Sequence, residues 1–245
     1  MRIILGEFIG TFILVFIGCG SIAFATYVYP ISLPVIASIW GLAVFTGIMS
    51  SAKLSSAHLN PAVTLAFVGL KKTGTKEIPL YFLGQILGSF LAAILLFILI
   101  QSNISDAWTF ESARMFGEYY GSEPSTDFEI FPFMAEFGGT FLLMLGILII
   151  TSFKYKSELP SVAFLIGVLL TVLIIVFAPY SQAGFNPARD FIPRLVSYLQ
   201  GCDFAFDYNN LAWLTVYILA PILGAIVGAI IYMLIKKSKK NPAQN

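Results

Sequence analysis

The sequence predicts an all-α membrane protein with six transmembrane helices and two re-entrant half-helices, built as an inverted 3+3 repeat. Three observations carry this prediction: an apolar composition, six long apolar runs, and two copies of an Asn-Pro-Ala segment. Of the 245 residues, 58% are hydrophobic and 11% are charged, whereas a soluble domain carries about 25% charged residues. The composition therefore excludes soluble enzymes, nucleic-acid-binding proteins and small secreted domains stabilised by disulfides.

The six apolar runs cover residues 3–25, 34–52, 78–101, 131–153, 160–180 and 211–235. Each run is long enough to cross about 30 Å of hydrocarbon, which takes roughly 20 helical residues. Glu7 and Glu136 are the only charged residues within them. The first run is too long for a cleavable signal peptide and lacks a cleavage-site pattern, so we expect it to be the first membrane span.

Lysine and arginine placement predicts the orientation, because cytoplasmic loops carry an excess of these residues. If the N-terminus is cytoplasmic and the spans alternate, 11 of the 14 basic residues lie on the cytoplasmic side. The long loop 102–130 then lies outside and is acidic. We therefore expect a multi-pass protein of the plasma or inner membrane with both termini in the cytoplasm.

An internal repeat relates the two halves of the chain. The segment that begins Gly6-Glu7-Phe8 recurs as Ala135-Glu136-Phe137, and Asn60-Pro61-Ala62 recurs as Asn186-Pro187-Ala188, at offsets of 129 and 126 residues. Helix-packing patterns alone could explain the first similarity but not the second. We expect one transmembrane domain over 1–245, with repeats at about 1–101 and 131–235. Each half has three spans, so the second half is inverted, which places a substrate path near the bilayer midplane.

Each Asn-Pro-Ala segment predicts a short helix inside the membrane. Asparagine is a favoured N-cap and proline is favoured at the first helical position, so Pro61 and Pro187 begin the two half-helices. Irregular backbone at membrane depth needs protein or a watery cavity to receive its polar groups. A narrow file of water or polyol would supply partners for the carbonyl groups of Ala57, His58, Leu59, Gly184 and Phe185.

These motifs together resemble the aquaporin and glycerol-facilitator (major intrinsic protein) family over essentially the full length. The residues that carry the resemblance are His58 to Thr64, Gly184 to Asp190, and the two buried glutamates. The resemblance implies the aquaporin-like fold, an hourglass pore in every subunit and a homotetramer in the lipid bilayer, with no cofactor and no metal. It also implies that Asn60 and Asn186 donate hydrogen bonds to solutes at the pore centre.

The resemblance further implies a selectivity filter of Trp40, Ile174, Ala183 and Arg189, closer to that of the plant nodulin-26-like branch than to the better-known filters. An alternative for Arg189 is a salt bridge with the adjacent Asp190. Asp190 and Arg194 match the glycerol-conducting branch, whereas Tyr217 and Ile100 depart from it. We assign structural roles to Pro61, Pro187 and Asp190.

Glu7 and Glu136 are candidates for function because ionisable residues are costly in a membrane. A proton relay is one possibility, and we favour structural support, in which both carboxylates accept hydrogen bonds from the half-helix loops. His58 is the only histidine and could act as a pH switch. The resemblance instead places its backbone carbonyl in the pore.

The sequence thus predicts a passive channel, not an enzyme, for water and small uncharged solutes such as glycerol, which excludes protons and ions. A water-selective pore or one for metalloid hydroxides or urea remains an alternative. A secondary transporter of a small neutral solute is the rival from another class, and Glu7 and Glu136 are the only candidates for its coupling-ion ligands. An intramembrane hydrolase or a cation channel lacks the residues that its chemistry would need.

Overall fold

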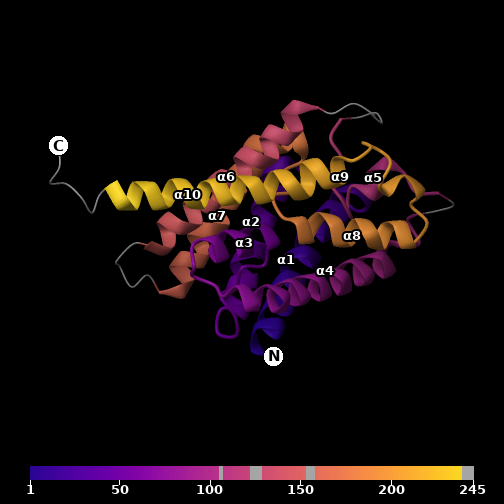
Figure 1. The fold of residues 1–245 in the computed structure, drawn as a ribbon. Helices are drawn as coiled ribbons and strands as arrows, with labels where there is room; N and C mark the ends of the chain where they lie inside the picture. Colours follow the sequence, from indigo (N-terminus) through magenta and orange to yellow (C-terminus); the bar gives the residue numbers. More distant parts are fainter. Residues whose placement is uncertain (105–106, 122–128, 153–157, 239–245) are drawn as a thin grey trace.

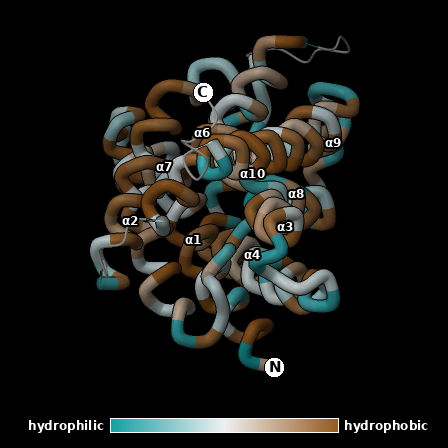
Figure 2. The backbone as a smooth tube through the Cα atoms, turned by 60° about the vertical axis from the view of Figure 1, so that its left-hand side comes forward, coloured by the Kyte–Doolittle hydropathy of each residue, from teal (hydrophilic) through white to brown (hydrophobic). Residues whose placement is uncertain are grey.

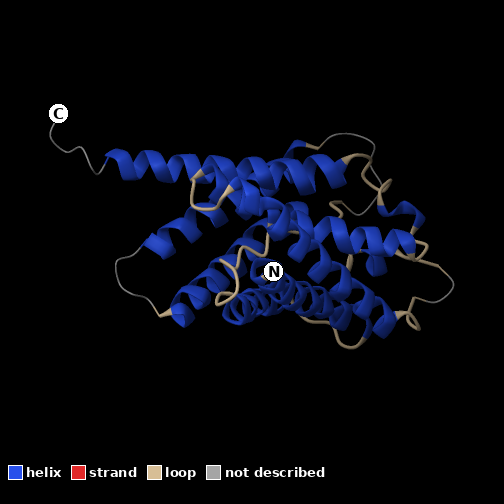
Figure 3. Ribbon diagram, turned by 60° about the horizontal axis from the view of Figure 1, so that its bottom comes forward, coloured by secondary structure: helices blue, strands red, loops and turns tan. Residues whose placement is uncertain are grey.

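The computed structural model describes residues 1–104, 107–121, 129–152 and 158–238, and within these ranges it contains helices and loops but no strand (Figure 3). Among the described residues, six helical segments are long and apolar enough to cross a membrane. They are α1 (Arg2–Tyr27), α2 (Leu33–Ser51), α4 (Ile78–Ile100), α6 (Ile130–Ser152), α7 (Leu159–Ser181) and the continuous run of α9 (Ala212–Leu214), η3 (Thr215–Leu219) and α10 (Ala220–Ser238). The six predicted spans are therefore confirmed, with ends shifted by a few residues at most.

Two shorter helices begin at the Asn-Pro motifs, as predicted. They are α3 (Pro61–Gly69) and α8 (Pro187–Leu199). Figure 1 shows both between the long helices α10 and α4, and each contacts the two halves of the bundle. The remaining elements are single turns at the ends of the bundle: η1 (Thr75–Glu77), α5 (Phe110–Ala113) and η2 (Asp203–Ala205).

The helix contacts come in corresponding sets. The contact of α1 with α4 matches that of α6 with α10, and α1 with α2 matches α6 with α7. Likewise α3 packs on α10, from the second half of the chain, while α8 packs on α4, from the first. Each half-helix is thus held by the opposite half, which brings the two Asn-Pro motifs together at the centre.

Glycines allow the long helices to approach closely. Gly84 and Gly88 of α4 lie against the backbone of α1, and Gly224 and Gly228 of α10 lie against that of α6. A Cβ atom at Gly84 would lie 2.6 Å from the carbonyl oxygen of Ile4, and one at Gly228 would lie 2.7 Å from that of Phe141. Small residues spaced by four are the usual means of close helix packing in membranes.

The outward surfaces of the long helices are apolar. Figure 2 shows hydrophobic colours along these helices and hydrophilic colours chiefly at their connections. Many large apolar side chains on them are exposed, for example Leu99, Phe164 and Leu234, as expected where lipid replaces water as the solvent. Cys19 and Cys202 are both buried and are not joined in a disulfide.

Candidate functional site: a cavity between the two half-helices

A cavity of about 590 Å³ runs along the bundle. At one end it is lined by Ala52, after α2, and Leu159, at the start of α7. At the other end it is lined by Arg114 and Gln182. Its walls are mainly apolar side chains of α1, α2, α6 and α7, and both loops that lead to the half-helices contribute to it. The cavity is therefore placed to carry a solute from one end of the bundle to the other.

Asn60 and Asn186 cap α3 and α8 with their side-chain oxygens. The Asn60 Oδ1 atom accepts from the N–H of Ala62 at 2.8 Å, and the Asn186 Oδ1 atom accepts from that of Ala188 at 3.0 Å. Such a cap satisfies a helix N–H group that otherwise has no partner, and proline at the next position has no N–H to satisfy. The motif thus fixes the start of each half-helix and the orientation of its asparagine.

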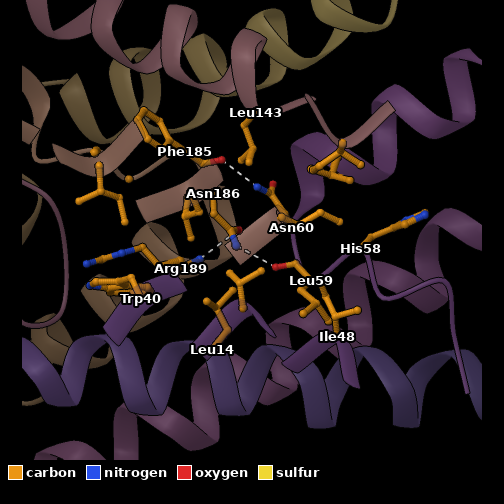
Figure 4. A pocket seen from close by; sticks show the side chains of 18 of the residues that line it. Leu14, Trp40, Ile48, His58, Leu59, Asn60, Leu143, Phe185, Asn186 and Arg189 are labelled. Atoms are coloured by element: carbon orange, nitrogen blue, oxygen red, sulfur yellow. Dashed lines mark hydrogen bonds between the residues drawn. The ribbon is translucent and has the colours of Figure 1, made fainter. Parts of the chain in front are cut away.

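The two asparagines also bind each other's loop. The Asn60 Nδ2 atom donates to the carbonyl of Phe185 at 2.8 Å, and the Asn186 Nδ2 atom donates to the carbonyl of Leu59 at 2.8 Å (Figure 4). Each amide nitrogen has two N–H groups, so one is used in the cross-link. The second N–H of each can serve a solute, because both residues line the cavity.

The loops before the half-helices have an unusual backbone. Ala57, Leu59, Ala183 and Phe185 all have φ between 50° and 62°, a left-handed region that costs a non-glycine residue about 1–3 kcal/mol. In each loop the left-handed residues are two positions apart, so successive peptide groups point in different directions. All five residues whose carbonyls we expected in the pore line the cavity, although the Leu59 and Phe185 carbonyls already accept from the asparagines.

Two buried glutamates hold these loops in place. Glu7 accepts from the N–H groups of His58 and Leu59 at 3.0 and 2.7 Å, from the Ser55 hydroxyl at 2.7 Å and from the Gln85 amide at 2.8 Å. Glu136 accepts from the corresponding N–H groups of Gly184 and Phe185 at 2.8 and 2.7 Å and from the Ser181 hydroxyl at 2.7 Å. These are the hydrogen bonds expected of structural support.

The His58 ring is packed away from the centre. It stacks on Phe67 and Tyr81, with ring centroids 4.8 and 4.3 Å away, and its Nδ1 atom lies 3.2 Å from the Thr64 hydroxyl. Figure 4 shows the ring on the opposite side of Asn60 from Arg189. No group of three or more His, Cys, Asp or Glu side chains within the described ranges could hold a metal ion.

The four residues of the expected filter come together in the same cavity. Trp40, Ile174, Ala183 and Arg189 all line it, and each is at most 6% exposed. The Arg189 guanidinium carbon lies 4.6 Å from the centroid of the Trp40 ring, and Figure 4 shows the two side chains stacked. The arrangement has three apolar side chains and one charged donor.

The alternative ion pair between Arg189 and Asp190 is wrong. Arg189 pairs with Glu118 of the loop between α4 and α6, with Nη2 and Oε1 2.5 Å apart, while Asp190 pairs with Arg194 at 2.9 Å. Successive side chains on a helix point in different directions, and residues four apart share a face. Glu118 lines the cavity beside Arg189. No local sequence signal identifies Glu118, since nothing in its neighbours distinguishes it from the other acidic residues of the loop.

Comparisons with known proteins agree with one another. The family model for the major intrinsic protein matches residues 1–232. Aquaporin NIP3-1 of Arabidopsis thaliana is 36% identical over 97% of this chain and 68% of its own length, and the aquaglyceroporin of Plasmodium berghei is 35% identical over 93% and 87%. Among solved structures, the aquaglyceroporin from Plasmodium falciparum superposes with a TM-score of 0.87 at 28% identity, over 99% of both chains.

Proposed function

The chain belongs to the major intrinsic protein family, and we propose that glycerol is a principal solute of its pore, admitted by a filter of Trp40, Ile174, Ala183 and Arg189. Membership makes the protein a passive membrane channel for water and small neutral solutes, and not an enzyme. The identity of the preferred solute and the roles of individual residues form our proposal.

We assign the pore centre to Asn60 and Asn186. Each offers an N–H group to a passing oxygen, and each caps a half-helix whose N-terminus carries about +0.5 elementary charge. Two such ends about 5 Å from a cation, at an effective dielectric constant of about 20, oppose it by roughly 3 kcal/mol. A neutral molecule that both donates and accepts hydrogen bonds does not meet this barrier.

One observation supports glycerol above all: three apolar side chains and one cationic donor line the same cavity, with the donor stacked on Trp40. Glycerol has a carbon backbone on one side and hydroxyl groups on the other, so it fits a wall of each kind. A hydroxyl that loses water without gaining a partner costs roughly 2–7 kcal/mol, which the Arg189 guanidinium offsets. Two of the similar proteins are named as aquaglyceroporins, which agrees with this assignment.

We further propose a homotetramer in the plasma or inner membrane, with both termini in the cytoplasm. The placement of lysine and arginine supports the orientation. The corresponding helix contacts support a single domain of two inverted repeats. Glu7 and Glu136 serve in it as acceptors that hold the two loops, and not as a proton relay.

Replacing Ile174 with histidine tests the filter assignment. Histidine would substitute a bulky hydrogen-bonding ring for part of the apolar wall, so we expect passage of glycerol to fall while water still passes. A tenfold fall in the ratio of glycerol to water permeability, about 1.4 kcal/mol of barrier, is the expected scale. The measurement is stopped-flow light scattering of proteoliposomes at matched protein density.

Ile174→Leu is the matched control, since it keeps an apolar side chain of similar volume and should keep the ratio near that of the wild type. An unchanged ratio in Ile174→His, with water flux intact, would mean that residue 174 does not face the constriction. Wild-type vesicles with no glycerol flux above empty vesicles would contradict the proposed solute.

A further inference from the structure

The outer loop contributes a carboxylate to the constriction. Glu118 lies in the loop between α4 and α6 and is 3% exposed, as is Arg189. Both line the cavity, and their side chains form the buried ion pair described above. The net charge of the filter at this point is therefore close to zero, and a hydrogen-bond donor, Arg189, lies beside an acceptor, Glu118.

Helix α8 holds the backbone of Glu118 in this position. The Glu118 N–H donates to the Asp190 carboxylate at 2.6 Å, and the Glu118 carbonyl accepts from the Arg194 guanidinium. Asp190 and Arg194 are themselves paired, so one buried ion pair of α8 binds both polar groups of this peptide segment. A Cβ atom at Gly117 would lie 3.0 Å from the Arg194 guanidinium carbon, so glycine lets the loop pass this close.

The loop is fixed on its other side by the segment that precedes α8. The Gln182 amide donates to the carbonyl of Tyr119 and accepts from Arg114 at 3.2 Å. A Cβ atom at Gly184 would lie 3.3 Å from the Glu118 Cγ atom, which places the glutamate against the loop that carries Ala183. The position of the carboxylate is thus set by packing and hydrogen bonds on two sides.

Arg189 is held from two directions and still has donors to offer. The Trp40 ring stacks on its guanidinium group, and the Glu118 carboxylate forms an ion pair with its Nη2 atom. The buried Nη1 atom has no hydrogen-bond partner within the described part of the chain. A carboxylate has about four acceptor sites, so Glu118 can accept from a solute while it binds Arg189. A hydroxyl group could therefore meet a donor and an acceptor at one level of the pore.

We propose that Glu118 is the fifth residue of the constriction and controls passage through it: as a carboxylate it holds Arg189 against the wall and accepts from solute hydroxyl groups, and loss of its charge slows the flux. Without the carboxylate, Arg189 becomes an uncompensated buried cation that binds water tightly and is free to turn into the lumen. The hydroxyl groups of a solute also lose their acceptor. This inference rests on the proposed function, because it assigns a control to the same filter.

The surroundings of Glu118 make its charge change within the physiological pH range. Burial raises the pKa of the Glu118 carboxyl to about 7, although Arg189 acts in the opposite direction. The carboxylate is thus charged above about pH 7 and protonated below it. The titratable and charged groups around it are Arg189, Asp190 and Arg194 of α8, Arg114 and Tyr119 of its own loop, Glu136 of α6, Tyr217 of η3 and Cys19 of α1.

The test compares water and glycerol permeability of proteoliposomes at about pH 8 and about pH 5.5, on either side of this pKa. For the wild type we expect both permeabilities to be about tenfold lower at the acid pH, the scale of one lost charge-assisted hydrogen bond. Glu118→Gln mimics the protonated form, so its flux should be low at both pH values. Glu111→Gln removes an exposed carboxylate from the same loop and should keep the wild-type response.

Equal wild-type flux at the two pH values would overturn the inference while leaving the channel function in place. So would a Glu118→Gln variant that conducts like the wild type at the higher pH or still responds to pH. The wild-type profile needs no substitution, so it decides the question even if the variant does not fold. Absence of flux at both pH values would contradict the proposed function itself.

Discussion

Replacing Glu136 with alanine is expected to prevent stable folding. The substitution removes the acceptor of three donors, namely the buried Phe185 N–H group and Ser181 hydroxyl and the part-buried Gly184 N–H group. Each costs on the order of 1–3 kcal/mol, so the total, roughly 3–9 kcal/mol, is comparable with the stability of a whole domain. The left-handed backbone of Ala183 and Phe185 would also lose the contacts that maintain it.

Glu136→Gln should be much milder, because one acceptor oxygen remains for Ser181 and Gly184, and the variant should keep much of the flux. Glu158→Ala is the control, as this glutamate is exposed and makes no side-chain cap bond at α7. The measurements are the yield of monodisperse protein in detergent and its unfolding temperature. If Glu136→Gln folded normally but conducted nothing, the relay hypothesis would gain and structural support alone would fail.

Gly224→Ala is expected to disrupt the packing of α10 on α6. A Cβ atom there would overlap the carbonyl of Phe137, and backbone cannot move aside as a side chain can. Overpacking of this kind costs about 1–3 kcal/mol or more. This opposes the helix propensity of alanine, which favours the substitution by up to about 1 kcal/mol.

Gly20→Ala is the matched control, because nothing lies within 4 Å of its added Cβ atom. We expect its unfolding temperature in detergent to equal or slightly exceed that of the wild type, whereas Gly224→Ala should unfold at a lower temperature. Equal unfolding temperatures of the two variants would show that close packing of α10 on α6 does not limit the stability of the protein.

Local signals in the sequence were sufficient for most of the fold. Six uncharged or nearly uncharged runs define the spans because hydrocarbon tolerates little else. Asn60-Pro61 and Asn186-Pro187 define the starts of α3 and α8, because a cap and a proline act on adjacent residues. The expected hydrogen bonds of Glu7 and Glu136 followed from the need to satisfy irregular backbone in a membrane.

Contacts between distant segments could not be predicted in the same way. Glu118 and Arg189 are 71 positions apart, and their pairing depends on the path of a loop that follows no helical period. The ion pair between Asp190 and Arg194 could have been predicted from the sequence, since Arg194 lies four residues after Asp190 on the same helix. The π-helical turn η3 was not predicted either, because the sequence indicated one regular helix over 211–235. Tyr217 lies in this turn, and its hydroxyl group donates to the carbonyl of Ser181 at 3.0 Å.

We propose that the paired half-helices let neutral solutes pass and exclude ions. The most direct measurement is made on one batch of wild-type proteoliposomes, with glycerol flux followed by light scattering and proton entry by an internal pH dye under an applied potential. We predict glycerol and water flux well above those of empty liposomes, together with a proton leak equal to theirs. A proton leak above that of empty liposomes would contradict the assignment of Asn60, Asn186 and the two helix ends as the barrier to ions.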